Sequence, residues 1–111
     1  MPLMRTIKKI SQDKELNEIL KRRKSSSFSL LYYSLWCSRS KTAIALADEW
    51  REREGDETMY LVNSWDLPQS FAAFSITSAP TLVHVKKGKI RVDVEYPKVY
   101  SYLTAGRPKT A

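Results

Sequence analysis

The spacing of apolar positions changes repeatedly along the chain and predicts strands that alternate with helices. Residues 6–10 fit a short first strand. The next apolar residues, Leu16, Ile19 and Leu20, recur at helical spacing and predict a helix that Ser11 caps at its start. Together they predict an opening unit of one strand and one helix.

A longer strand and helix follow in the middle of the chain. Residues 28–35 form an aromatic and aliphatic run with little polar alternation, which is typical of a strand covered on both faces. Residues 40–53 have helical apolar spacing, and Gly55 is expected to end that helix. Residues 59–62 predict another short strand, and a short helix is expected to start near Pro68.

The last part of the chain predicts a hairpin and a final helix. Residues 81–85 fit a strand, Lys87 and Gly88 make the turn, and residues 90–95 alternate apolar with charged side chains as in a half-covered strand. Pro97 is expected to start the last helix. The order βαβαβαββα predicts an α/β fold with a central mixed sheet and helices on both faces.

The composition fits one domain of this kind. The 111 residues are 42% hydrophobic and 28% charged, an ordinary balance for a globular protein. We expect a single domain over residues 1–104 and a flexible basic tail over residues 105–111. No stretch approaches the roughly 18 apolar residues that cross a bilayer, and the N-terminus lacks the apolar core of a signal peptide. We therefore expect a cytoplasmic monomer with no membrane partner.

Positive charge gathers in three clusters, and the formal net charge is +7. The clusters lie at residues 21–24, 86–89 and 107–109. Such charge can attract nucleic acid or an acidic partner. It also fits a solvated helix end, a hairpin turn and a tail, and no aromatic-interleaved nucleic-acid motif accompanies it. A nucleic-acid partner is therefore the less favoured interpretation.

Cysteine and histidine are scarce in this sequence. Cys37 is the one cysteine and His84 the one histidine, which excludes an internal disulfide and a cysteine-built metal site. We expect no metal and no cofactor. We interpret His84 as a packed residue of the sheet, because nothing titratable accompanies it in the sequence.

Cys37 is the residue most suited to chemistry. It follows the long apolar strand and opens a helix, where unpaired backbone N–H groups and the helix dipole favour a thiolate. Arg39 and Lys41 add positive charge nearby. A thiolate is the nucleophile of disulfide exchange. The alternative is that Cys37 is a small buried hydrophobic residue, as most free cysteines are.

Two segments carry a resemblance to a known family. Residues 30–41, which contain Trp36-Cys37-Ser38-Arg39-Ser40, resemble the active-site strand and Trp-Cys-x-x-Cys motif of the thioredoxin family. Residues 74–88, which contain Ser78-Ala79-Pro80, are similar to the family's cis-proline stretch and the hairpin after it. The resemblance covers about residues 5–104. It identifies the chain as an atypical thioredoxin-like protein with a monothiol Cys-x-x-Ser site.

The resemblance implies how these segments form a binding site. Pro80 would be the cis-proline packed beside Cys37. The backbone of Ser78 and Ala79 would pair with an extended segment of a partner. The side chains that would border this groove and contact a substrate are Trp36, Arg39 and Trp65.

The sequence departs from the family pattern at the residues that resolve the mixed disulfide. Ser40 stands where the family has its second cysteine, and a serine hydroxyl cannot displace a thiol from a mixed disulfide. Ser40 remains a predicted site residue beside Cys37, because its hydroxyl can donate to the thiolate. The family's buried aspartate falls at Leu31 and its lysine partner near Leu61. Both charges are therefore absent together.

Two functions follow from this pattern. In the first, an atypical monothiol enzyme forms mixed disulfides with protein or low-molecular-weight thiols through Cys37, and an outside thiol completes the exchange. In the second, a redox-inactive module binds a protein partner through the groove around Cys37 and Pro80. A basic nucleic-acid accessory protein is a third and weaker interpretation. Ordinary dithiol reduction is not expected.

Overall fold

The structure of the protein, a computed structural model, describes residues 5–22, 27–53, 55, 57–63 and 67–105. The strands are β1 (Thr6–Lys9), β2 (Ser27–Tyr33), β3 (Thr58–Asn63), β4 (Thr81–Lys86) and β5 (Lys89–Asp93). The helices are α1 (Asp13–Arg22), α2 (Ser38–Arg51), α3 (Pro68–Ala73) and α4 (Tyr96–Thr104). The predicted order βαβαβαββα is confirmed. The predicted tail lies outside the described residues beyond Ala105.

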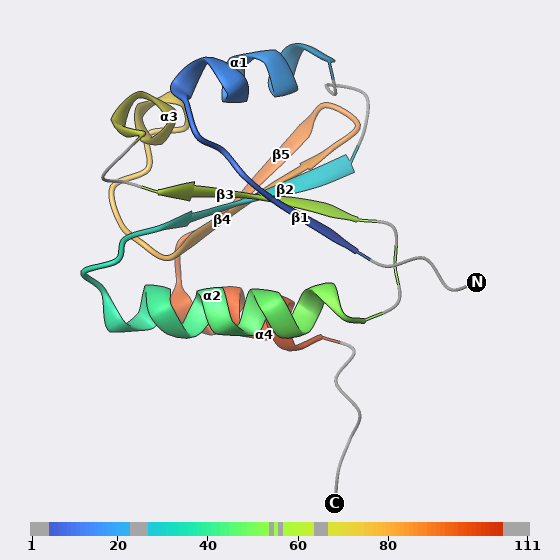
Figure 1. Ribbon diagram of the computed structural model, residues 1–111, viewed down its shortest axis with the longest axis vertical. Coiled ribbons are helices and arrows are strands. Elements are labelled where there is room, and N and C mark those ends of the chain that lie inside the picture. The colour runs from blue at the N-terminus through green and yellow to red at the C-terminus, as the bar shows by residue number, and fades with distance from the viewer. Residues whose placement is uncertain (1–4, 23–26, 54, 56, 64–66, 106–111) are drawn as a thin grey trace, which may run out of the picture.

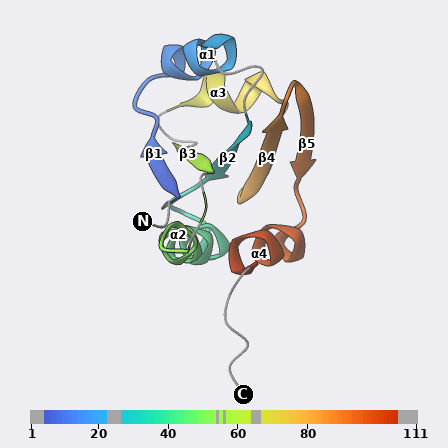
Figure 2. The same ribbon diagram turned by 90° about the vertical axis from the view of Figure 1, so that its right-hand side faces the viewer.

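The strands form one mixed sheet in the order β1-β3-β2-β4-β5. β1, β3 and β2 run parallel, whereas β4 pairs antiparallel with β2 and β5 pairs antiparallel with β4. Helices α1 and α3 cover one face of this sheet, and α2 and α4 lie side by side on the other (Figures 1 and 2). The predicted mixed sheet with helices on both faces is therefore confirmed.

Strand β2 runs through the centre of the sheet, and all of its residues after Ser27 are buried. Because neighbouring side chains of a strand point to opposite faces, Leu30 packs into the core beneath α1 and α3, and Leu31 packs into the core beneath α2 and α4. This double coverage explains why the sequence of the strand has little polar alternation.

The helix ends differ from two of the predictions. Helix α1 begins at Asp13, so Ser11 does not cap it; instead the Asp13 carboxylate accepts hydrogen bonds from the Ser70 backbone N–H (2.7 Å) and hydroxyl (2.6 Å) and thereby joins α1 to α3. Helix α2 ends at Arg51 with Glu52 as its C-cap, so Gly55 does not end it. Both helices are placed by the packing of their apolar faces, which overrides the local signals.

The covered face of β5 is the reverse of the one that its alternation predicts. Ile90, Val92 and Val94 are exposed by 55%, 40% and 56%, whereas Asp93 is buried. The reason is the position of β5 at the edge of the sheet. Helix α4 contacts β4 and β5 on the charged face, while the layer of α1 and α3 lies over the other strands (Figure 2).

Within the described residues, no helix is long and apolar enough to cross a membrane.

Candidate functional site

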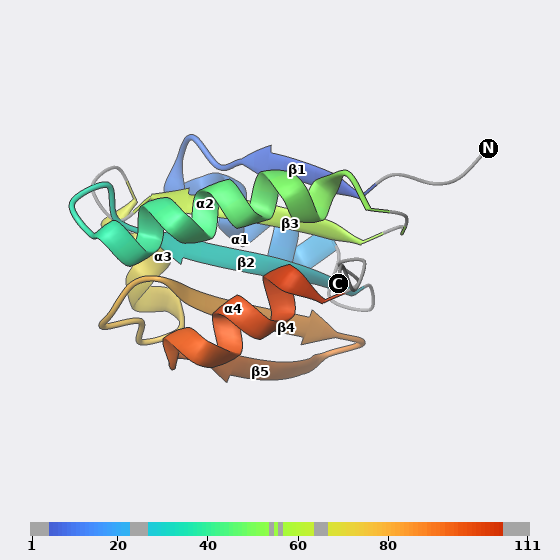
Figure 3. The ribbon, with the colours of Figure 1, turned by 90° about the horizontal axis from the view of Figure 1, so that it is seen from below.

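The end of β2 leads through a short loop into the start of α2 (Figure 3). Cys37 occupies the N-cap position of this helix. Its backbone is extended, with φ −107° and ψ 124°. The Cys37 N–H donates to the Ser34 carbonyl over 3.1 Å, and its own carbonyl accepts the Lys41 N–H over 3.2 Å. The side chain is half-exposed and holds a free thiol. The predicted position at the start of a helix is therefore the observed one.

The Ala79–Pro80 segment lies against this thiol. The peptide bond between the two residues is cis, and the Cys37 Sγ donates to the Ala79 carbonyl over 3.6 Å. Pro80 is buried, Ala79 is half-exposed and Ser78 is exposed. The fold therefore brings together two motifs that are about 40 residues apart in the sequence, and it leaves the backbone before Pro80 accessible.

The start of α2 lowers the pKa of the Cys37 thiol. The largest cause is the Ser40 backbone N–H, which points to the sulfur and favours the thiolate. The Arg39 N–H, the Ser40 hydroxyl and the positive charge of Arg39 act in the same direction, while burial of the sulfur opposes them. The first turn of the helix thus stabilises the nucleophilic form of Cys37.

Ser40 has two roles in this turn. Its side chain is only 1% exposed, and its Oγ accepts the Ser34 N–H over 3.1 Å. Because a hydroxyl can accept one hydrogen bond and donate another, Ser40 holds the loop before α2 and remains able to donate to the Cys37 thiolate. Leu31 and Leu61, where the family pattern has charges, are direct partners on β2 and β3, and Leu31 is fully buried.

Apolar side chains surround the thiol unevenly. Trp36 is 83% exposed and Leu35 56% exposed, whereas Tyr33 is a core residue at 5%. Arg39 stacks over the Tyr96 ring, with its guanidinium carbon 5.1 Å from the ring centroid. This contact joins α2 to α4 and holds the positive charge close to Cys37. Trp65, which the sequence placed at the border of the groove, lies outside the described residues.

The lowered pKa of Cys37 predicts a pH profile for alkylation. The rate of reaction with iodoacetamide should rise with pH around a midpoint below the roughly 8.5 of a free thiol. Arg39→Ala should raise the midpoint slightly and less so at high salt, because the lost charge is exposed and screened, whereas the backbone N–H groups remain. Lys14→Ala on α1 is the charge-matched control and should leave the profile unchanged. A wild-type midpoint at or above that of a free thiol would contradict the prediction.

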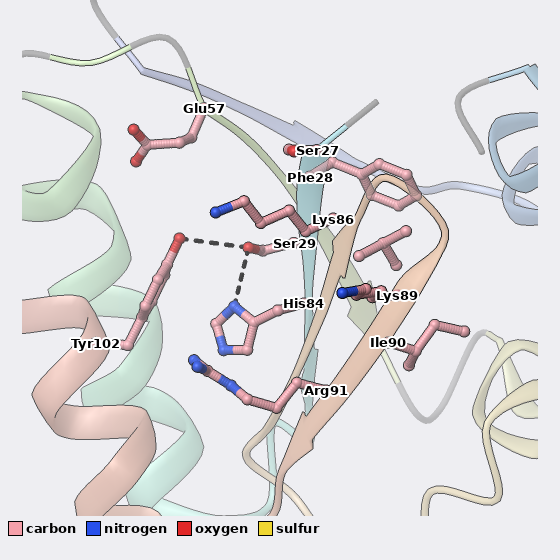
Figure 4. Close-up of a pocket in the computed structure, with 11 residues that line it drawn as sticks. Ser27, Phe28, Ser29, Glu57, His84, Lys86, Lys89, Ile90, Arg91 and Tyr102 are labelled. Atoms are coloured by element: carbon pink, nitrogen blue, oxygen red, sulfur yellow. Dashed lines mark hydrogen bonds between the residues drawn. The ribbon is translucent and has the colours of Figure 1, made fainter. Parts of the chain in front are cut away.

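A second polar cluster lies at the other end of β2, in a pocket of about 490 Å³ between the β4–β5 hairpin and α4 (Figure 4). Burial, and after it the charge of Arg91, lower the pKa of His84 and favour the neutral imidazole. Its Nε2 lies 3.0 Å from the Asp93 carboxylate and must donate, so its Nδ1 accepts from the Ser29 hydroxyl over 3.4 Å. The Tyr102 hydroxyl in turn lies 3.4 Å from Ser29.

This chain of hydrogen bonds joins a carboxylate, an imidazole and a serine hydroxyl, which is also the order of a hydrolase triad. Ser29 is only 4% exposed, however, and its two contacts are both long. We therefore assign the cluster the role of holding β2, β4 and β5 to α4, which agrees with the interpretation of His84 as a sheet residue. Sequence reasoning missed Ser29 and Asp93; the signal was a serine inside an apolar run and an aspartate in an alternating strand.

Comparison with known proteins identifies similar folds but no similar sequence. The sequence matches no protein-family model and no curated protein sequence. Solved structures are similar: a thioredoxin of Schistosoma mansoni has a TM-score of 0.72 and 22% identity over 91% of this chain and 95% of its own. The thioredoxin of Malassezia sympodialis has a TM-score of 0.71 and 18% identity, over 94% and 92% of the two chains. The chain therefore has the thioredoxin fold, as the sequence predicts.

Proposed function

We propose that this thioredoxin-fold protein is a monothiol exchange protein that forms mixed disulfides with protein or low-molecular-weight thiols through Cys37. The observation that carries the proposal is the placement of one half-exposed thiol at the start of α2. Its pKa is lowered by the Ser40 and Arg39 N–H groups, and its sulfur lies 3.6 Å from the Ala79 carbonyl. These are the conditions that favour a nucleophilic thiolate.

The proposed exchange proceeds in two steps. The Cys37 thiolate attacks one sulfur of a substrate disulfide, a new S–S bond forms to Cys37, and the other substrate sulfur leaves as a thiolate. An outside thiol then loses its proton and attacks the mixed disulfide, which releases Cys37 as a thiolate. The second step needs a thiol from solution, because Ser40 offers only a hydroxyl. A reducing compartment such as the cytoplasm, where we also place this protein, supplies such thiols.

The proposed substrate-binding surface lies on both sides of the thiol. An extended substrate segment would pair with the accessible backbone of Ser78 and Ala79. Trp36, at 83% exposed, would pack on the same segment, and Arg39 would meet acidic groups beside the disulfide. We retain Trp65 as a proposed contact from the sequence alone.

Glutathione disulfide tests the first step. We expect the wild-type protein to gain one glutathione, seen as a single adduct by intact mass spectrometry, and to lose it when reduced glutathione is added in excess. The adduct should form faster at pH 8 than at pH 6, because more thiolate is present. Cys37→Ser is the control that should gain none. A wild-type protein that reacts no faster than free cysteine at equal pH would contradict the proposal.

One observation favours the second candidate function, a redox-inactive module that binds a protein partner through the same groove. Trp36 and Leu35 expose large apolar surfaces beside Cys37, and aromatic side chains often carry the binding energy of an interface. Cys37→Ser separates the two functions. A partner that the variant still binds with unchanged affinity would favour the module, whereas loss of capture with the thiol would favour exchange.

A further inference from the structure

We propose that the free edge of β5 pairs with β5 of a second copy of this chain, so that two sheets join into one across a two-fold axis. The inference rests on the exposed side chains of the strand, on the direction of its free backbone groups, and on the order of its charges. It does not depend on the chemistry of Cys37, which lies at the start of α2. The proposed dimer differs from the monomer expected from the sequence.

β5 is an open edge. It is the last strand of the sheet order, and among the described elements none lies beyond it (Figures 2 and 3). Open edges expose unpaired N–H and C=O groups and are ready to pair with another strand. The exposed apolar side chains of Ile90, Val92 and Val94 lie along this edge, on the face that α1 and α3 leave uncovered.

The hairpin determines which backbone groups face outward. The turn has two residues, Lys87 (φ 49°) and Gly88 (φ 83°), and it closes on the pair Lys86 and Lys89. Hydrogen-bonded pairs then alternate along the antiparallel ladder, so the N–H and C=O groups of Lys89, Arg91 and Asp93 point to β4. The N–H and C=O groups of the residues between them therefore point to the open edge. These are the same residues whose apolar side chains are exposed: Ile90, Val92 and Val94.

Symmetric antiparallel registers centred on any residue from 90 to 94 let these outward groups pair, and charge favours one of them. Centring on Ile90 would put Lys89 opposite Arg91, and centring on Val94 would put Asp93 opposite Glu95. Centring the pair on Arg91 would put two arginines opposite each other, and centring it on Asp93 would put two aspartates opposite each other. Centring on Val92 places Lys89 opposite Glu95 of the second copy. It also places Arg91 opposite Asp93 of the second copy, whose buried carboxylate already contacts His84 and Arg91 of its own chain. Opposite charges directly across a pair of strands stabilise it, and like charges destabilise it.

The Val92 register also matches on the apolar face. Val92 meets its own copy, and Ile90 meets Val94 of the second copy. Both are hydrogen-bonded pairs in this register. The residues that form main-chain hydrogen bonds across the interface are therefore the same ones that bury apolar side chains there. The segment Lys-Ile-Arg-Val-Asp-Val-Glu over residues 89–95, which is β5 and the two residues that lead from it to α4, is thus complementary to itself when reversed, as an isologous interface requires.

The other edge of the sheet gives an internal contrast. β1 has four residues, Thr-Ile-Lys-Lys, and its charges are both positive. Antiparallel pairing of β1 with a copy of itself would bring lysines together, and exposed lysines are a common way to protect an edge. The charges of β1 would repel a second copy of that strand, whereas β5 carries charges of both signs. Of the two edges, β5 is therefore the one suited to pair with itself.

Sedimentation velocity over a range of concentrations tests the dimer. The wild-type protein should show a species of twice the 12.8 kDa chain mass, with a dissociation constant on the order of micromolar, as a small interface predicts. Arg91→Glu should raise that constant at least about tenfold, because it places like charges opposite each other twice. Lys14→Glu on α1 makes the same change of charge away from the edge and should leave the constant unchanged.

A cross-linking pair tests the register without relying on stability. In a Cys37→Ser background, Val92→Cys should form an intermolecular disulfide on mild oxidation, because hydrogen-bonded partners have Cα atoms about 5.5 Å apart. Ile90→Cys should not, because its partner is Val94 of the other copy. A wild-type protein that stays monomeric up to about 1 mM, whether or not it captures a different strand at β5, would overturn the proposal. So would equal cross-linking of the two cysteine variants.

Discussion

Replacing Ser40 with cysteine is expected to give this protein an internal disulfide and a measurable activity in the reduction of insulin. With thioredoxin reductase as the electron source, the wild-type protein should show no turnover above the background without added protein. Ser40→Cys should exceed that background rate at least about tenfold. The reason is the missing resolving thiol. Ser40 is one helical turn from Cys37, and its Oγ already acts on the Cys37 thiolate, so a sulfur at this position would be close enough to attack a mixed disulfide.

Two controls separate the new thiol from the loss of the hydroxyl. Ser40→Ala removes the hydroxyl that accepts the Ser34 N–H and should stay inactive. The double variant Cys37→Ser with Ser40→Cys should also stay inactive, because Ser40 is only 1% exposed and its replacement cannot reach a substrate first. Turnover of the wild-type protein at the rate of an ordinary thioredoxin would show that a resolving thiol is not needed.

Leu31→Asp is expected to cost about 3–5 kcal/mol of unfolding free energy at pH 7, since it buries an unpaired carboxylate. Leu31 is fully buried between Leu61 on β3 and Leu82 on β4, in the core beneath α2 and α4. This loss is a large part of the roughly 5–15 kcal/mol that stabilises a domain of this size. Urea denaturation measures it directly.

The dependence on pH distinguishes the charge from the lost packing. Burial should raise the pKa of the new carboxyl in the folded state above its unfolded value. The destabilisation should therefore be largest at pH 7, where the unfolded state gains by ionising, and should shrink as the pH falls towards 4. Leu31→Ala creates a cavity without a charge and should cost the same at both values of pH. A pH-independent cost for Leu31→Asp would contradict the argument.

A lysine on the neighbouring strand should recover part of this loss. Leu61 is the register partner of Leu31 and is half-buried, so the amine of Leu61→Lys can reach the new carboxylate and keep contact with water. A double-mutant cycle should give a favourable coupling of about 1–3 kcal/mol between Leu31→Asp and Leu61→Lys. Zero coupling would show that the two positions do not form a charge pair in this fold.

The sequence by itself determined the elements and the main position of the site. The largely apolar run of β2 predicted a strand covered on both faces, and the helical stripe after it placed Cys37 at a helix start. The single cysteine and Ser40 excluded dithiol chemistry without any coordinates. These conclusions hold because they depend on local periodicity, on the backbone groups of one helix turn, and on residue type.

The tertiary structure alone decided what depends on neighbours distant in sequence. The alternation of β5 predicted that its apolar face is covered, but α4 covers the charged face, because β5 lies at the edge of the sheet and α4 packs there. The contact of Arg39 with Tyr96 joins residues 57 positions apart, and the Ser29, His84 and Asp93 cluster joins three strands. No local pattern encodes such contacts, since each requires the chain to fold before the partners meet.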